Sequence, residues 1–210
     1  MLEWGIDRLQ HANLDYPVFA LAFSEMDAEI AAAALRARPI TVVRSIFLSK
    51  LRSLLYFGKQ YSLDTLVIIS LEAICLTPLT LVRDICDWHF RSHNTYTPAA
   101  GFPEGATVEV INTCVLQALC EITLPPHLQE PRVVVQSLLS ANSSLTELPF
   151  GLRILPYAPH CKIASEPSRT PLRISFQTPE DVAIMRAVAA KLQHRCKSET
   201  NALEHWKQQA

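Results

Sequence analysis

Three side chains suited to zinc binding share one face of a predicted helix. Cys86, His89 and His93 are spaced i, i+3 and i+7, which places them within about 60° of one another around a helix axis. Thiolate and imidazole groups are common zinc ligands. The same face also carries Leu79 and Val82, and neither a fourth ligand nor a C-x-x-C motif accompanies the three. We therefore interpret these residues as part of a hydrophobic core, and we predict no metal and no cofactor.

Nucleophilic catalysis is a second chemistry that the cysteines could support. The six cysteines stand at positions 75, 86, 114, 120, 161 and 196. A reactive thiol needs an electropositive and partly exposed setting. Cys161 lies in a proline-rich segment, and Cys196 lies near the end of a predicted helix, where the helix dipole raises a thiol pKa. A Cys-dependent hydrolase is therefore kept only as an alternative function.

A basic segment could bind phosphate groups. Residues 30–63 carry six lysines and arginines and no acidic residue. The candidate anion- or nucleic-acid-binding residues are Arg36, Arg38, Arg44, Arg52 and Lys59. Tyr56 is the only aromatic side chain near their polar face, so no platform for stacking bases is evident. Binding of RNA or phosphate is the alternative, and pairing with the acidic segments of the protein is favoured.

An apolar stripe near the carboxyl terminus could bind a partner. Thr178 and Pro179 open a predicted helix that runs to about residue 207. Its apolar residues recur at spacings of three and four, as in a heptad repeat. The predicted partner-binding residues are Met185, Leu192, Leu203 and Trp206. We expect the partner to be another protein chain or a second copy of this chain.

Glycine is scarce, and this scarcity bears on function. The chain has five glycines among 210 residues, against an average of about 7%. Phosphate-binding loops and sharp catalytic turns usually need glycine. We therefore predict a protein that is not an enzyme: a non-enzymatic interaction or scaffold subunit of a larger assembly, able to self-associate.

The elements that would position these residues divide into two halves. Residues 1–95 are predicted to be a helical region, and residues 93–106 a connecting loop. Helices are expected at 25–36, with Ser24 as N-cap, and at 40–57, 62–76, 77–92 and 110–122. Residues 133–139 suit either a strand or a helix.

The second half changes its hydrophobic period. Residues 152–154 and 172–176 alternate apolar and polar side chains, and residues 161–164 could form a third strand. The predicted fold class is therefore α+β: a helical amino-terminal half, then a small antiparallel sheet and a long carboxyl-terminal helix. We expect residues 106–210 to form an α+β region that packs with the first half as one compact unit.

Composition and the most apolar segment indicate the class of protein and its cellular compartment. Hydrophobic residues make up 49% and charged residues 19% of the chain, which is typical of a globular protein. The most apolar run, residues 66–82, is interrupted by Glu72 and Pro78, so we predict no membrane span. Glu3 and Asp7 stand where a secretory signal would be basic. A cytoplasmic or nuclear protein with reduced cysteines is therefore expected.

Overall fold

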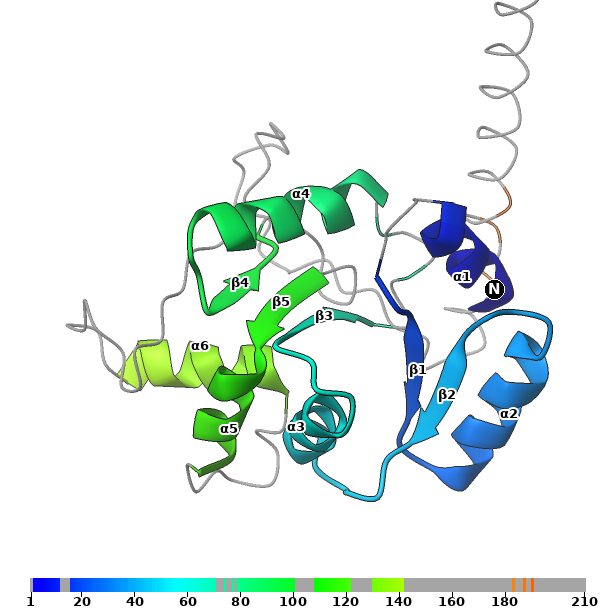
Figure 1. Cartoon of the computed structure of the whole chain (residues 1–210), viewed down its shortest axis with the longest axis horizontal. Coiled ribbons are helices and arrows are strands. Elements are labelled where there is room, and N and C mark those ends of the chain that lie inside the picture. Colours follow the sequence, from blue (N-terminus) through cyan, green and yellow to red (C-terminus); the bar gives the residue numbers. More distant parts are fainter. Residues whose placement is uncertain are drawn as a thin grey trace, which may run out of the picture.

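Strands and helices alternate along most of the described chain (Figure 1). The computed structural model describes residues 2–11, 16–70, 79–100, 108–121 and 130–141, with the single positions 74, 77, 183, 187 and 190. The elements are α1 (Leu2–His11), β1 (Phe19–Ala22), α2 (Glu25–Leu35), β2 (Thr41–Arg44), α3 (Lys50–Gln60), β3 (Thr65–Ile69), α4 (Leu79–Arg91), β4 (Tyr96–Pro98), β5 (Val108–Asn112), α5 (Thr113–Glu121) and α6 (Pro131–Ala141). The fold is therefore α/β, and the predicted helical first half is wrong.

The described strands form two sheets. β1 and β2 are parallel, with Phe19 opposite Thr41 and Ala22 opposite Arg44. The helix α2 makes the crossover between them, which is the βαβ arrangement that parallel neighbours require. The second sheet is antiparallel and has the order β3-β5-β4. An antiparallel sheet was predicted, but from segments beyond residue 150 and not from residues 65–112.

Two hydrophobic cores lie on opposite faces of these sheets. The first core contains residues of α1, α2 and α4, and the second contains residues of α3, α5 and α6. The strand β5 alternates between them: Val108 and Val110 belong to the first core, and Ile111 belongs to the second. Helices on both faces of a central sheet layer give the three-layer architecture of α/β proteins.

The predicted helix at residues 40–57 is replaced by a strand, a loop and a helix. Thr41, Val42 and Val43 are β-branched, and such side chains favour extended backbone. After β2, the Ser45 hydroxyl accepts a hydrogen bond from the Phe47 amide at 3.0 Å. Ser49 then caps α3, which begins at residue 50. Within the predicted helix at 40–57, the backbone is therefore helical only from residue 50 onward.

The same error recurs at two other places. The predicted helix at residues 62–76 contains β3, whose sequence TLVII is again rich in β-branched residues. The predicted helix at 110–122 is split between the end of β5 and α5, and the predicted loop at 93–106 contains β4. The ambiguous segment at 133–139 is helical, within α6.

Helices with clear capping signals were predicted correctly. α2 begins after Ser24, whose hydroxyl accepts a hydrogen bond from the Asp27 amide. α4 spans residues 79–91, within the predicted helix at 77–92. No helix among the described residues is long and apolar enough to cross a membrane.

Much of the carboxyl-terminal third lies outside the described residues. The predicted strands at 152–154, 161–164 and 172–176 fall there, as do Met185, Leu192, Leu203 and Trp206. At Ala183, Ala187 and Ala190 the backbone is helical and the side chains are exposed, which agrees with the helix expected there. The apolar stripe and the division of the chain at residues 93–106 stay predictions.

Candidate functional site

The parallel strands point to one edge of the molecule as the candidate site. From β1 the chain passes through α2 to β2 on one side, and then returns through α3 to β3 on the other side (Figure 1). In open α/β sheets, ligands bind outside the carboxyl ends of the strands, where the strand order changes direction. We call residues 23–27 and 44–52 the carboxyl edge, because they follow β1 and β2 and include the first turns of α2 and α3.

The first turn of α2 is already supplied with negative charge. The Ser24 hydroxyl donates a hydrogen bond to Asp27 Oδ2 at 2.6 Å and accepts one from the Asp27 amide at 3.0 Å. Glu25 Oε1 lies 3.4 Å from Arg44 Nη1, at the end of β2. Both carboxylates sit where the positive end of the helix dipole stabilises them. This helix end therefore offers little attraction to a further anion.

The first turn of α3 has the opposite character. It contains no acidic residue, and it carries Lys50 and Arg52 beside the N-cap Ser49. Free amide groups and the helix dipole at such a position attract phosphate. Lys50 Nζ lies 2.5 Å from Glu130 Oε1 and 5.9 Å from the centre of the Phe23 ring. The carboxyl edge thus combines a helix amino terminus with three cationic side chains, Arg44, Lys50 and Arg52.

The cations of the carboxyl edge can exchange their partners. The side chains of Arg44 and Lys50 are about half exposed in their ion pairs with Glu25 and Glu130. Exposed ion pairs of this kind contribute at most about 1 kcal/mol. A phosphate group forms stronger charge-assisted hydrogen bonds with such donors. A ligand phosphate could therefore replace either carboxylate at small cost.

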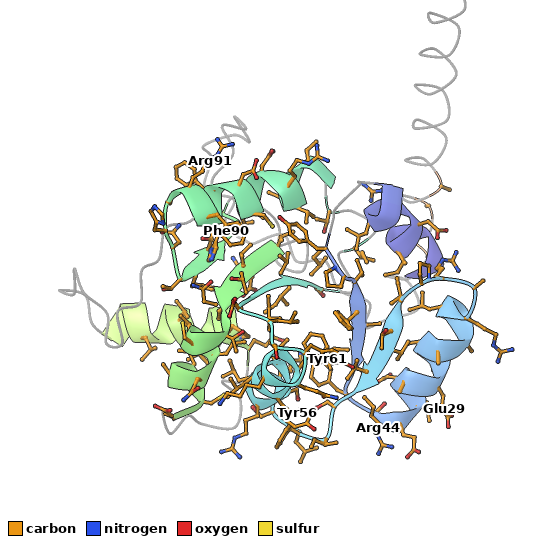
Figure 2. All side chains as sticks on the ribbon, viewed as in Figure 1. Glu29, Arg44, Tyr56, Tyr61, Phe90 and Arg91 are labelled. Carbon is orange, nitrogen blue, oxygen red and sulfur yellow. The ribbon has the colours of Figure 1, made fainter. Side chains whose placement is uncertain are left out.

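Exposed apolar side chains border the same cations. Large apolar residues that are exposed at or beside the carboxyl edge are Phe23, Met26, Ile46, Leu48 and Tyr56. The Tyr56 ring of α3 lies 5.6 Å from the Phe47 ring of the carboxyl edge. Arg44 lies beside α2, the helix that carries Glu29 (Figure 2). Exposed aromatic rings next to cations suit a ligand that has both a flat base and phosphates.

The predicted basic residues do not form one surface. Arg44 and Arg52 belong to the carboxyl edge, whereas Arg36 follows the end of α2. Arg38 is half-buried, and its guanidinium binds the Asp7 carboxylate through contacts of 2.6 and 2.8 Å. Lys59 lies in the last turn of α3, at the other end of that helix. Only part of the predicted set can therefore contact one ligand.

The three candidate zinc ligands have other roles or positions. Both ring nitrogens of His89 lie at 2.9 Å from oxygen atoms, Nδ1 from Thr97 Oγ1 and Nε2 from Asn112 Oδ1. Cys86 is buried, and burial together with the charge of Asp87 raises the pKa of its thiol to about 11. His93 lies beyond the end of α4, with a positive φ of 50°. The core interpretation fits His89 and Cys86.

Two of the described cysteines, Cys86 and Cys120, are poor candidates for a nucleophile. Burial raises the pKa of Cys120 as well as that of Cys86, and a raised pKa lowers the fraction of reactive thiolate. Cys114 is exposed at the start of α5. Cys75, Cys161 and Cys196 lie outside the described residues.

Two residues of the carboxyl edge were missed in the sequence. Phe23 precedes the helix predicted at 25–36 and received no role, and Lys50 lies inside the helix predicted at 40–57. The signal that could have located both is a short β-branched or apolar run followed within five residues by a serine N-cap. That pattern marks a strand that ends at a helix amino terminus, which is the geometry of ligand sites in α/β folds.

Comparison with known proteins gives the fold a context. No protein-family model matches the chain, and no curated protein matches its sequence. A cytidylyltransferase from Leptospira borgpetersenii has a similar structure, with a TM-score of 0.68 and 16% identity over 86% of this chain and 71% of that chain. A CMP:2-keto-3-deoxy-manno-octonic acid synthetase complexed with CTP has a TM-score of 0.58 and 11% identity, over 90% and 88% of the two chains.

A third solved structure extends the same similarity. The molybdopterin-guanine dinucleotide biosynthesis protein A from Archaeoglobus fulgidus has a TM-score of 0.56 and 8% identity, over 89% of this chain and 86% of that one.

These likenesses overturn our prediction of a non-enzymatic interaction or scaffold protein, with its RNA-binding and Cys-dependent hydrolase alternatives. Scarce glycine does not exclude such a fold, because β1 and β2 reach α2 and α3 through turns that end in the N-cap residues Ser24 and Ser49. The chain has a nucleotidyltransferase-like α/β fold.

Proposed function

We propose that the protein binds a nucleoside triphosphate at the carboxyl edge and transfers its nucleotidyl group to an acceptor. The observation that carries this proposal is the fold likeness to the Leptospira cytidylyltransferase, at a TM-score of 0.68 over 86% of the chain. Two of the three similar structures are named for cytidylyl or CMP products, and one holds CTP. CTP is therefore the proposed donor.

The proposed reaction is a displacement at the α-phosphorus of CTP. An acceptor oxygen forms a bond to this phosphorus, the bond to the oxygen bridging the α- and β-phosphates breaks, and pyrophosphate leaves with the electron pair. The acceptor hydroxyl gives up its proton to solvent. Such transfers depend mainly on positioning and on neutralising the phosphate charge.

The residues of the carboxyl edge can supply part of this positioning. Lys50 and Arg44 would contact phosphate oxygens, helped by the amide groups in the first turn of α3. The half-exposed ring of Phe23, with Lys50 at 5.9 Å from its centre, would contact the base.

A divalent cation is a common participant in phosphoryl transfer, where carboxylates hold it. At the carboxyl edge, however, Asp27 is engaged by Ser24 and Glu25 pairs with Arg44. Across the residues that the structure describes, no three His, Cys, Asp or Glu side chains gather as a metal site would need. The described residues therefore do not fit a metal ion, and we assign no step to one.

The proposed activity can be tested by pyrophosphate release. We expect the full chain to release pyrophosphate from CTP when 2-keto-3-deoxy-manno-octonic acid or a related sugar acid is the acceptor, and to do so faster than from GTP or UTP. Lys50→Ala should lower the rate at limiting CTP about tenfold, which corresponds to about 1.4 kcal/mol of lost phosphate binding. Lys59→Ala is the matched control, because it removes the same group from the other end of α3.

The outcomes separate binding from transfer. Equal losses in the Lys50 and Lys59 variants would show that the carboxyl edge is not the donor site. CTP binding without any pyrophosphate release, across a panel of sugar acid and alcohol acceptors, would contradict nucleotidyl transfer.

A further inference from the structure

The carboxylate of Glu109 lies on the same side of the fold as the carboxyl edge. β3 starts where α3 ends, so its last residue, Ile69, returns to the side on which α3 begins. Ile69 pairs with Val108, and Glu109 is the next residue of β5. Val108 belongs to the first core, and side chains alternate along a strand, so the Glu109 side chain lies on the face of the second core. Its strand partners, Ile68 and Pro98, carry no charge.

Polar side chains from two other elements surround Glu109. The hydroxyl of Tyr96, in β4, donates a hydrogen bond to Glu109 Oε2 at 2.8 Å. The charges of Arg132, in the first turn of α6, and of Glu130, which directly precedes this helix, both act on the Glu109 carboxyl. Glu109 therefore belongs to a cluster of two carboxylates, one cation and one phenol.

One member of this cluster also binds a cation of the carboxyl edge. Glu130 Oε1 lies 2.5 Å from Lys50 Nζ, at the start of α3. In this arrangement the positive charge of Lys50 offsets the negative charge of Glu130. The ion pair thus connects the proposed phosphate site with the surroundings of Glu109.

A phosphate bound to Lys50 would change this balance of charge. The phosphate would replace Glu130 as the partner of Lys50, and it would bring its own negative charge to the same place. Glu130 would then lie near Glu109 without the compensating charge of Lys50. Two neighbouring carboxylates that lack a counter-charge favour the state in which they share one proton.

The surroundings of Glu109 already favour its protonated form. Burial is the largest cause that raises the pKa of this carboxyl, and the charge of Glu130 acts in the same direction. The hydrogen bond from Tyr96 and the charge of Arg132 act in the opposite direction, because they stabilise the carboxylate. Glu109 therefore titrates at a higher pH than an ordinary glutamate, and a change in the nearby charge alters its proton content there.

We propose that the Glu109–Glu130 pair takes up a proton when a ligand phosphate displaces Glu130 from Lys50. Glu109 is then a positioning residue of the donor site, because its protonation lets Glu130 leave Lys50 without forming two adjacent charged carboxylates. The proton comes from the buffer and binds a carboxylate oxygen, and no covalent bond of the ligand changes. By linkage, phosphate binding tightens as the pH falls through the range in which the pair titrates.

This inference rests on the phosphate site at Lys50 that is part of the proposed function, but it does not require nucleotidyl transfer. Isothermal titration calorimetry measures the proton uptake. The full chain is titrated with CTP, and separately with inorganic tripolyphosphate, at half-unit steps between pH 7.5 and 6, in two buffers that differ in ionisation enthalpy. The dependence of the measured enthalpy on the buffer gives the number of protons taken up.

Glu109→Gln isolates the contribution of the pair. Both ligands titrate by themselves, so the quantity compared is the difference between the wild type and the variant. We expect the wild type to take up more protons per bound ligand, by about 0.2 to 1 proton at one or more of these pH values. Glutamine can still accept the hydrogen bond of the Tyr96 hydroxyl, and circular dichroism would verify that the fold is retained.

Glu130→Gln tests the displaced carboxylate at an exposed position. This variant should lose the additional proton uptake, and it should bind both ligands about threefold more tightly, because no carboxylate competes for Lys50. Tyr96→Phe removes a hydrogen bond that favours the charged form of Glu109, so the additional uptake should move to higher pH. Asp64→Asn is the matched control: it removes an exposed carboxylate just before β3, at the opposite end of that strand, and should change neither quantity.

Two results would overturn this proposal alone. The first is equal proton uptake by the wild type and Glu109→Gln while both ligands bind. The second is unchanged affinity and unchanged uptake in Glu130→Gln. Failure of both CTP and tripolyphosphate to bind would contradict this proposal and the proposed function together. Additional proton uptake in a protein that releases no pyrophosphate from CTP would support the pair and contradict nucleotidyl transfer only.

Discussion

Replacing Leu116 with alanine is expected to lower the free energy of unfolding by about 3 kcal/mol. Leu116 lies on α5 and is 0% exposed in the second core, together with Ile111 and Val134. Removing three carbon atoms there loses burial energy and leaves a cavity, because neighbouring strands and helices can close it only in part. Urea unfolding followed by circular dichroism measures the change.

Leu48→Ala is the control for this prediction. The substitution is chemically identical, but Leu48 is 97% exposed in the loop between β2 and α3. Its effect on the free energy of unfolding should stay below about 0.5 kcal/mol. Similar losses in the two variants would mean that the second core is not organised as the structure shows.

Acidification is expected to destabilise the fold through His89. Asn94 Nδ2 donates a hydrogen bond to Thr97 Oγ1 at 3.2 Å, so the Thr97 hydroxyl is directed to donate to His89 Nδ1. Asn112 Oδ1 accepts from His89 Nε2 and from the Thr65 hydroxyl, at 2.9 and 3.0 Å. This buried network is complete for a neutral imidazole with its proton on Nε2. Burial accordingly lowers the pKa of His89 below 6.5.

The direction of the pH effect follows from this lowered pKa. Below pH 6.5 the unfolded chain binds a proton at His89 more readily than the folded protein does. The free energy of unfolding therefore falls as the pH decreases. For one proton the slope approaches about 1.4 kcal/mol per pH unit. Above pH 6.5 this residue contributes no pH dependence. Urea unfolding at half-unit steps from pH 7.5 to 5 would measure the slope.

A His89→Gln variant isolates this contribution. Glutamine cannot titrate, so the slope below pH 6.5 should decrease, by at most the contribution of one proton. The burial of Glu109 raises its pKa and acts in the opposite direction in acid, but Glu109 is present in both proteins and cancels in the comparison. An unchanged slope in the variant would contradict a neutral, buried His89.

Helices were predictable where local signals define their ends. Ser24 caps α2 from the residue just before it, and the Thr77-Pro78 pair stands in the sequence just before α4, so both helix starts are indicated by the sequence alone. His89 and Cys86 were correctly placed on the buried face of their helix, because the apolar neighbours of that face have helical spacing.

The strands were not predictable by the same means. β1, β2 and β3 are four or five residues long, and an apolar run of that length suits a strand or a helix equally well. Their pairing joins residues far apart in the chain, such as Thr65 and Asn112. Only tertiary contacts decide between the two structures. Because residues 50–57 have helical spacing, the predicted helix was extended backward over the residues that form β2.

The carboxyl edge was missed for the same physical reason. Its residues come from two loops that become neighbours only when β1 and β2 pair in parallel. Arg44 was predicted as an anion-binding residue from its charge alone. Its proposed contact with a phosphate depends on its position at the end of β2, near the amino terminus of α3. Phe23 and Lys50 carry no signal by themselves, and they are brought together by the same pairing.

The central claim is that the carboxyl edge binds the nucleotide, and amide chemical-shift mapping during a CTP titration tests it most directly. We predict saturable shifts concentrated at residues 23–27 and 44–52, with the largest near the first turn of α3. Lys50→Ala should weaken the apparent affinity about tenfold, and Lys59→Ala should leave it unchanged. Saturable shifts confined to other parts of the fold, or no shifts at millimolar CTP, would contradict the account.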